Sequence, residues 1–164
     1  MTDGHREGSR QTIIFVDADG CPVKEEVYRV ARRYGVPVTV VANSWMRVPE
    51  EEGFELALVK GDFDAADDWI AERACERDVV VTADIPLADR CLKSGARVLG
   101  PRGREFTRDS IGEAMAARDL SAELRDMGIQ TGGPEPFGKR DRSRFLQALD
   151  AMLQGCRRGP QGSG

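Results

Sequence analysis

The chain has 164 residues, of which 40% are hydrophobic and 32% charged, and its net charge at pH 7 is -4. This length suits one domain with a single core. No apolar run approaches the roughly 18 residues that cross a bilayer, so we expect a cytoplasmic protein without membrane contact. We expect a polar, disordered lead over residues 1–11, one domain over 12–154 and a disordered tail over 155–164.

Charge is unevenly distributed along the chain. The first 96 residues have a surplus of acids, whereas the remainder has a surplus of bases. That division suits a site that holds cations beside a surface that meets an anion. A chance distribution of solvated charge is the alternative.

The cysteines do not predict a zinc site. Cys21, Cys75, Cys91 and Cys156 have no Cys-x-x-Cys spacing, and the single histidine, His5, lies in the lead. We expect Cys75 and Cys91 to be reduced core residues within helices. Cys21 is expected to be a turn or cap residue, because no histidine is available to activate it.

The stretch from residue 13 to 22 predicts a buried strand followed by an acidic turn. Residues 13–16 are four consecutive apolar residues, as in a strand covered on both faces. Asp17 and Asp19 follow with a spacing of two, so both point to one side if the chain is extended. Gly20 permits a tight turn and Pro22 suits a helix start. In open parallel sheets, ligands bind outside this end of the strands.

The following residues alternate helices and strands. The apolar spacing predicts, in chain order, a helix over 23–34, strands over 37–42 and 54–59, a helix over 61–74, a strand over 79–82, a helix that begins at Pro86 and ends at Gly95, and a strand over 97–99. Glu55 interrupts the strand over 54–59, which we therefore expect at a sheet edge. Right-handed crossovers then give an α/β fold with a mainly parallel, doubly wound sheet of order 3-2-1-4-5.

The last third of the chain is predicted to be helical. A pair of helices is expected to begin at a cap on Thr107 or Ser110, with Ser110 and Glu113 at capping-box spacing, and to stop at Gly128. A last helix is expected over 139–154. Its start is crowded with cations, at the end where the helix dipole disfavours them, which hints that an anion docks there.

Acidic residues are expected to meet at one edge of this sheet. The strand order makes the first and fourth strands neighbours, which brings Asp17 and Asp19 beside Asp84, with the acidic helix start at 62–68 close by. Carboxylates so close together cannot all ionise unless they share a cation. Because the donors are all oxygen, Mg²⁺ or Mn²⁺ is favoured, and such an ion activates water for attack on a phosphate. The alternative is that each acid caps a separate turn.

Seven short motifs, in order, carry a family resemblance. They are Val-Asp-Ala-Asp-Gly-Cys-Pro at 16–22, Val-Ala-Asn at 41–43, Asp-x-Ala-Asp at 64–67, Thr-Ala-Asp-Ile-Pro-Leu-Ala at 82–88, Pro-Arg-Gly at 101–103, Gln-Thr-Gly-Gly-Pro at 130–134 and Arg-Asp-Arg at 140–142. From about residue 12 to 154 the chain resembles the uncharacterised bacterial YaiI/YqxD family.

That family is similar to PIN-like domains, which are metal-dependent nucleases with a Rossmann-like, three-layer fold and extra C-terminal helices. The resemblance implies that Asp17, Asp19, Asp84 and an acid of the 64–67 segment, Asp64 or Asp67, are metal ligands. Asp68 is an extra acid beside the motif, so the helix carboxylate that faces the ion stays open. The family has no settled substrate.

Two other functions fit parts of the pattern. Asp17-x-Asp19 after an apolar strand also looks like the first motif of haloacid-dehalogenase-type phosphatases, with Asp17 as nucleophile and Asp19 as general acid. Thr82 resembles their second motif, but the paired acids Asp67 and Asp68 precede Thr82 when they should follow it. A non-catalytic RNA-binding module that keeps the acids as a structural cation site is the other alternative.

Further residues are predicted to assist the metal and the substrate. Asn43 and Thr82 follow strands that flank the first strand, so we expect them to orient an aspartate or the attacking water. A phosphodiester that approaches an acidic cluster needs compensating positive charge, and glycines let it approach the backbone. We therefore expect RNA as substrate, on a phosphate track of Arg102, Thr131, Gly132, Gly133, Arg140 and Arg142.

Overall fold

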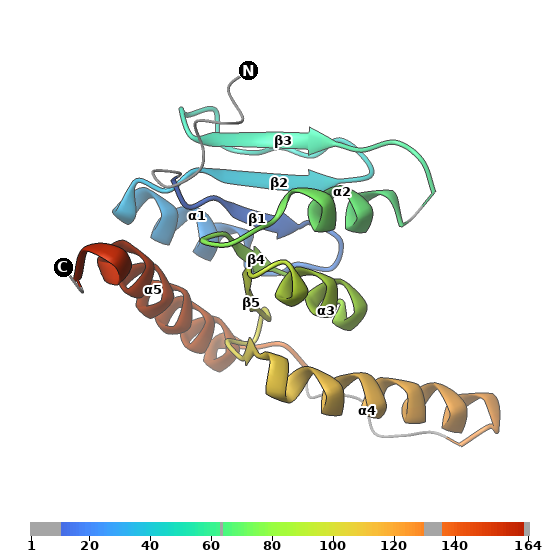
Figure 1. The fold of residues 1–164 in the computed structure, drawn as a ribbon. Helices are drawn as coiled ribbons and strands as arrows, with labels where there is room; N and C mark the ends of the chain where they lie inside the picture. The colour runs from blue at the N-terminus through green and yellow to red at the C-terminus, as the bar shows by residue number, and fades with distance from the viewer. Residues whose placement is uncertain (1–10, 63, 130–135, 163–164) are drawn as a thin grey trace.

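The chain folds into one sheet between two layers of helices (Figure 1). The computed structural model describes residues 11–62, 64–129 and 136–162, with side chains to residue 155. The strands are β1 (Ile14–Asp17), β2 (Val38–Ala42), β3 (Phe54–Leu58), β4 (Val79–Val81), β5 (Arg97–Leu99) and β6 (Glu105–Phe106). The helices are α1 (Lys24–Tyr34), α2 (Ala65–Arg73), α3 (Ile85–Lys93), α4 (Arg108–Asp126) and α5 (Lys139–Gly162).

The sheet has the order β3-β2-β1-β4-β5-β6. Its first five strands are parallel, with Ile14 of β1 opposite Val38 of β2 and Val79 of β4. The predicted α/β class, Rossmann-like three-layer arrangement and strand order are confirmed. The sixth strand was not predicted: β6 pairs antiparallel with β5 and has two residues, too few to show an alternating pattern.

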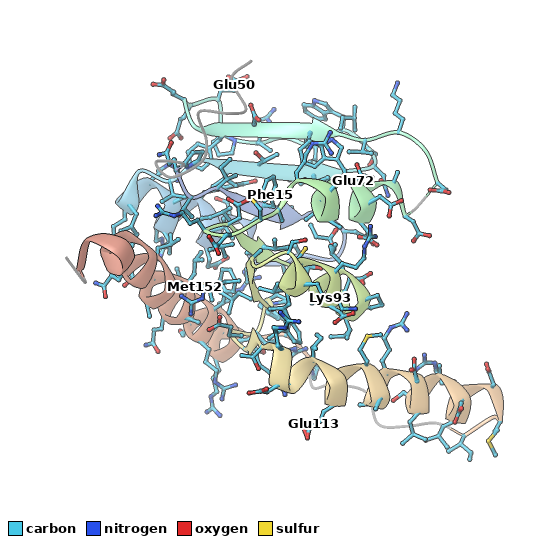
Figure 2. The ribbon with its side chains drawn as sticks, viewed as in Figure 1. Phe15, Glu50, Glu72, Lys93, Glu113 and Met152 are labelled. Atoms are coloured by element: carbon cyan, nitrogen blue, oxygen red, sulfur yellow. The ribbon has the colours of Figure 1, made fainter. Side chains whose placement is uncertain are left out.

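The central strands are buried because apolar helices cover both of their faces. Every residue of β1, β2 and β4 is buried, whereas β3 alternates between partly buried and exposed residues, as expected of an edge. Successive side chains of β1 face opposite layers. Ile14 and Val16 pack with α1 and α5, whereas Phe15 packs with α2 and α3. Phe15, near the middle of Figure 2, and Met152 on α5 mark the two cores.

Helix boundaries follow local signals at several ends. The helix α1 ends at Gly35, whose positive φ of 65° is readily adopted by glycine, as predicted. The expected pair of helices is instead the single helix α4, begun by a capping box between Thr107 and Ser110. The box expected between Ser110 and Glu113 was therefore wrong, because Ser110 takes the third helical position, whereas Thr107 is the cap.

Two other boundaries differ from expectation. The helix α5 continues to Gly162, beyond the predicted end at 154, since a single glycine such as Gly155 costs a helix only about 1 kcal/mol. Cys75 was expected within a helix but follows the end of α2, where its backbone N–H donates to Asp78. Cys91 lies in α3 and is buried, as predicted, and Cys21, Cys75 and Cys91 are free thiols. No helix in the described residues is long and apolar enough to span a membrane.

Candidate functional site

A cavity of about 640 Å³ opens at the carboxyl ends of the central strands. We call it the acid cavity, because six aspartates line it from three segments: the end of β1, the start of α2 and the start of α3. They are Asp17, Asp19, Asp64, Asp67, Asp68 and Asp84. The right-handed connections of the sheet bring these segments to one edge, as the sequence predicted.

Asp17 is the most enclosed of these acids. It is the last residue of β1, only 6% exposed, and its Oδ2 accepts a hydrogen bond of 2.8 Å from the Thr82 hydroxyl. Burial raises the pKa of the Asp17 carboxyl, the Thr82 hydrogen bond opposes that effect, and Asp84 and Asp19 add to the rise. The surroundings of Asp17 therefore favour its protonated form, and a nearby cation would favour the ionised form.

Thr82 connects the two central acids. Its hydroxyl donates to Asp17 and accepts, at 3.0 Å, from the backbone N–H of Asp84. Thr82 is 2% exposed, so no solvent competes for these bonds. The residue thus fixes the orientation of Asp17, and the structure brings it into direct contact with a cluster acid, where the sequence expected it.

Asp84 both caps the start of α3 and lines the acid cavity. Its Oδ1 accepts the backbone N–H of Leu87 at 2.9 Å, which caps the helix. The capping alternative from the sequence is therefore correct for one oxygen of Asp84. It does not apply to Asp64, which occupies the corresponding position before α2 but makes no side-chain capping bond. The carboxylates at α2 are not explained as caps.

The acids of α2 differ in what they face. Asp67 lies toward the cluster: burial, followed by Asp84, Asp17 and Asp64, raises its pKa to about 7. Asp68 pairs instead with Arg90 at 2.8 Å, and both of those side chains are about half exposed. The sequence left open which carboxylate of the α2 start faces the cluster. Asp67 is the one whose pKa is raised by burial and by the neighbouring acids.

The basic residues of the acid cavity are not those that the sequence selected. Arg90 of α3 and Arg118 of α4 line it. Neither arginine was predicted. Arg118 lies far along the chain on α4, whose outer half extends beyond the sheet (Figure 1), and no sequence motif around Arg118 indicates a place at the cavity.

The predicted phosphate track lies outside this lining. Arg102 pairs with Asp141 at 3.1 Å, and Arg142 donates to the carbonyl of Pro22 at 2.7 Å and lies 3.3 Å from Glu26. Arg142, at the start of α5, thus meets an acid of α1, and Arg102 meets an acid of α5. Arg140 is exposed. Thr131, Gly132 and Gly133 lie outside the described residues, as do His5 and the lead up to residue 10.

Asn43 also lines the acid cavity, from the residue after β2. Its amide is exposed, so it faces the solvent side of the cavity and a bound water or substrate can reach it. Cys21 is buried nearby, and burial raises the pKa of its thiol. That effect keeps the thiol protonated, in agreement with the prediction that Cys21 is no nucleophile.

The donor chemistry of the acid cavity suits a hard divalent ion, because carboxylate and amide oxygens line it, and no cysteine or histidine is among the described residues of its lining. The buried Asp17 and the partly buried Asp67 both disfavour ionisation without a cation. In the part of the chain that the structure describes, however, no three acidic, thiol or imidazole side chains stand close enough together to hold an ion without rearrangement.

Comparison with known proteins identifies the family. Residues 15–155 match the family described as "Uncharacterized BCR, YaiI/YqxD family". A UPF0178 protein of Sphingopyxis alaskensis is 60% identical over 148 residues, which cover 90% of this chain and 96% of the relative. UPF0178 proteins of a Caulobacter species and of Rhodospirillum centenum are 56% and 55% identical, over 90% and 89% of this chain and 97% of each relative. The motifs, the sheet and these relatives agree, and the chain belongs to the YaiI/YqxD family.

Proposed function

We propose that the protein is a metal-dependent nuclease that hydrolyses phosphodiester bonds of RNA, with Mg²⁺ or Mn²⁺ in the acid cavity. The observation that carries the proposal is the convergence of Asp17, Asp67 and Asp84 from two strand ends and one helix start. A bound cation would offset the repulsion between these carboxylates and lower the raised pKa of Asp67.

Each residue has a role in this proposal. Asp17, Asp19, Asp67 and Asp84 hold the ion, with Asp64 as a further oxygen donor at the rim. The ion supplies an activated water and stabilises charge on the phosphate. Thr82 keeps Asp17 oriented, and Asn43 positions the water from the open side of the cavity. Because the carboxylates stand apart without a cation, they move inward when the ion binds.

Arg118 gives the substrate a cation at the cavity itself. A phosphodiester is repelled by surplus carboxylates, and the Arg118 guanidinium on the cavity wall offsets that repulsion. Arg90 pairs closely with Asp68, at 2.8 Å, whereas Arg118 lies 3.8 Å from Asp119, so Arg90 is the less available of the two cations. Arg102, Arg140 and Arg142 remain candidates for contacts with more distant nucleotides.

The phosphatase alternative is less well supported by the geometry. A nucleophilic aspartate has to present a carboxylate oxygen to the phosphate, whereas Asp17 is only 6% exposed and its Oδ2 accepts a hydrogen bond from Thr82. Capping is insufficient as an explanation too, because it uses one oxygen of Asp84 and none of Asp64.

The test combines metal binding with cleavage. The wild-type protein is stripped with chelator, and its melting temperature and its cleavage of a labelled RNA are measured as Mn²⁺ is added. Asp17→Asn combined with Asp84→Asn should abolish both responses. Asp62→Asn is the matched control, because Asp62 is exposed near the start of α2 but does not line the cavity.

The outcomes separate the alternatives. A melting-temperature rise that persists undiminished in the double variant contradicts the metal site. Metal binding and RNA binding without cleavage support the non-catalytic module. Release of inorganic phosphate from a small phosphoester, with Asp17 phosphorylated, supports the phosphatase.

A further inference from the structure

A second cavity, of about 870 Å³, lies between α1 and the segment that joins β2 to β3. We call it the indole cavity, after the tryptophan on its wall. It shares no lining residue with the acid cavity. Its charged and aromatic lining residues include Glu25, Tyr28, Trp45, Arg47, Glu50 and Glu55.

The indole cavity presents aromatic surface to solvent. Trp45 is 71% exposed, which is unusual for so large an apolar side chain. Tyr28 of α1 forms the floor, and its ring meets Phe54 edge to face at 5.5 Å between centroids. Tyr28 is therefore packed beneath the cavity, whereas the Trp45 indole is available to a ligand.

The hydroxyl of Tyr28 lacks a partner. Tyr28 is 3% exposed, and within the described residues its hydroxyl oxygen is the buried side-chain atom that finds no hydrogen bond. Burial, followed by the nearby Glu25, raises the pKa of Tyr28 to about 12, so the phenol stays neutral. Buried polar groups are normally satisfied, and this hydroxyl, with less than 1 Å² of accessible surface, gains a partner only if the side chains around it shift slightly when a ligand binds.

The charge of the indole cavity selects the ligand. The lining carries three carboxylates, from Glu25, Glu50 and Glu55, and one guanidinium, from Arg47. Arg32 lies over the Phe54 ring, but its charge is paired with Glu51, which is outside the lining. Glu50 projects at the upper edge of the molecule in Figure 2. An excess of negative charge attracts a cation and repels a polyanion, and the face of an indole favours a cation as well. Nucleic acid is therefore the wrong partner for this surface.

We propose that the indole cavity binds the guanidinium group of an arginine side chain presented by a partner polypeptide. Its planar cation stacks on Trp45, and its five N–H donors meet the acceptor oxygens of the glutamates and of the Tyr28 hydroxyl. An ammonium group is also cationic, but it is not planar and has fewer donors. This inference does not depend on the nuclease proposal, because no residue is shared between the two cavities.

The test uses a blocked Gly-Arg-Gly tripeptide, with its citrulline counterpart as an uncharged isostere and guanosine monophosphate as the nucleotide probe. Binding is followed by the indole N–H resonance of Trp45, which Trp45→Phe identifies beside that of Trp69. The arginine peptide should shift this resonance, and the shift should weaken with salt. The citrulline peptide should bind at least about fivefold more weakly, since it loses the charge on the indole and carboxylates.

Three variants make the proposal specific. Glu25→Gln combined with Glu55→Gln should weaken binding of the arginine peptide and remove its salt dependence. Tyr28→Phe should weaken binding without loss of fold, because the deleted hydroxyl has no protein partner. Glu113→Gln, on the exposed side of α4, is the control and should bind as the wild type does.

Four results overturn the proposal. They are an unmoved Trp45 resonance at millimolar arginine peptide, equal binding of the citrulline peptide, preferential binding of guanosine monophosphate, and unchanged binding in the glutamate double variant. Each is independent of metal or RNA cleavage, so failure here leaves the nuclease proposal intact, and the converse also holds.

Discussion

The acid cavity and the indole cavity are both lined by carboxylates, but burial gives those carboxylates different chemistry. In the acid cavity, burial and neighbouring acids raise the pKa of Asp17 and Asp67. In the indole cavity, Glu25, Glu50 and Glu55 are exposed and solvated. Without a cation, Asp17 and Asp67 of the acid cavity resist ionisation. The solvated glutamates of the indole cavity only attract a cation. Centrally placed acids therefore fit a resident ion, and peripheral acids fit a transient charged partner.

The largest expected effect separates the two acids that are adjacent on α2. Asp67→Asn should lower metal-dependent RNA cleavage by about a hundredfold or more, because a ligand that faces Asp17 and Asp84 is lost. Asp68→Asn should change cleavage little, since Asp68 faces Arg90. Initial rates at saturating Mn²⁺ measure the difference.

Glu55→Gln extends the comparison to the indole cavity and should leave cleavage unchanged. If Asp68→Asn is the more damaging α2 variant, the assignment of Asp67 as the acid that faces the ion is wrong. If Glu55→Gln matches Asp67→Asn, the two cavities are not separate in function.

Thr82→Val should produce the next largest effect. This substitution keeps the side-chain volume nearly constant. It removes the hydroxyl that donates a hydrogen bond to Asp17 and accepts one from the backbone N–H of Asp84. Loss of a group that orients a metal ligand costs roughly 10-fold to 100-fold in metal affinity. Thr82→Ser keeps the hydroxyl and should retain most of the affinity. Calorimetric Mn²⁺ titration of both variants checks the prediction, which is contradicted if valine and serine behave alike.

Much of this site was predictable from local sequence because its parts are local. A continuous apolar run predicts β1, and the two aspartates after it follow the chain into the turn. Strand order followed from the handedness of crossovers, which brought Asp84 beside Asp17. The capping pattern also identified Asp84 from the sequence. It did not show that the same carboxylate caps α3 with one oxygen and lines the cavity.

The unpredicted parts depend on contacts between distant segments. Arg118 reaches the acid cavity because α4 packs against α3, and the sequence of α4 carries no strong apolar period to orient it. Arg102 was assigned to substrate, but its contact with Asp141 joins residues 39 apart. The indole cavity was not predicted either, because it also depends on contacts between separate segments. Tyr28 lies in the helix before β2, and Trp45 lies in the loop after it.

Arg118→Ala should distinguish the cavity wall from the predicted phosphate track. Removal of one cation near the reacting phosphate should raise KM for RNA by about tenfold and reduce the salt dependence of binding. The measurement is KM at several salt concentrations. Arg142→Ala should instead lower the melting temperature, because Arg142 ties α5 to Glu26 and the Pro22 carbonyl. A larger KM effect at Arg142 than at Arg118 would restore the track as the main phosphate contact.

The smallest effect concerns the pH dependence of stability in the metal-free protein. The pKa of Asp67 is about 7 in the fold, against an ordinary value of 3.8, so the folded state binds an extra proton between these values. Its stabilising contribution is complete below about pH 4 and is lost as the pH rises through 7. With chelator present, the free energy of unfolding from urea titrations should therefore fall over that interval. Asp67→Asn should flatten the fall, with a residual slope of the same sign from Asp17.

Mn²⁺ should reverse this trend, because an ion binds the ionised carboxylates and competes with their protons. Stability of the metal-loaded wild type should rise with pH over the interval in which the metal-free protein weakens. Glu25→Gln, in the indole cavity, should alter neither curve, since its carboxylate does not line the acid cavity. Parallel curves with and without Mn²⁺ would show that the acids of the two cavities respond to cations alike, and the distinction between a resident ion and a transient partner would fail.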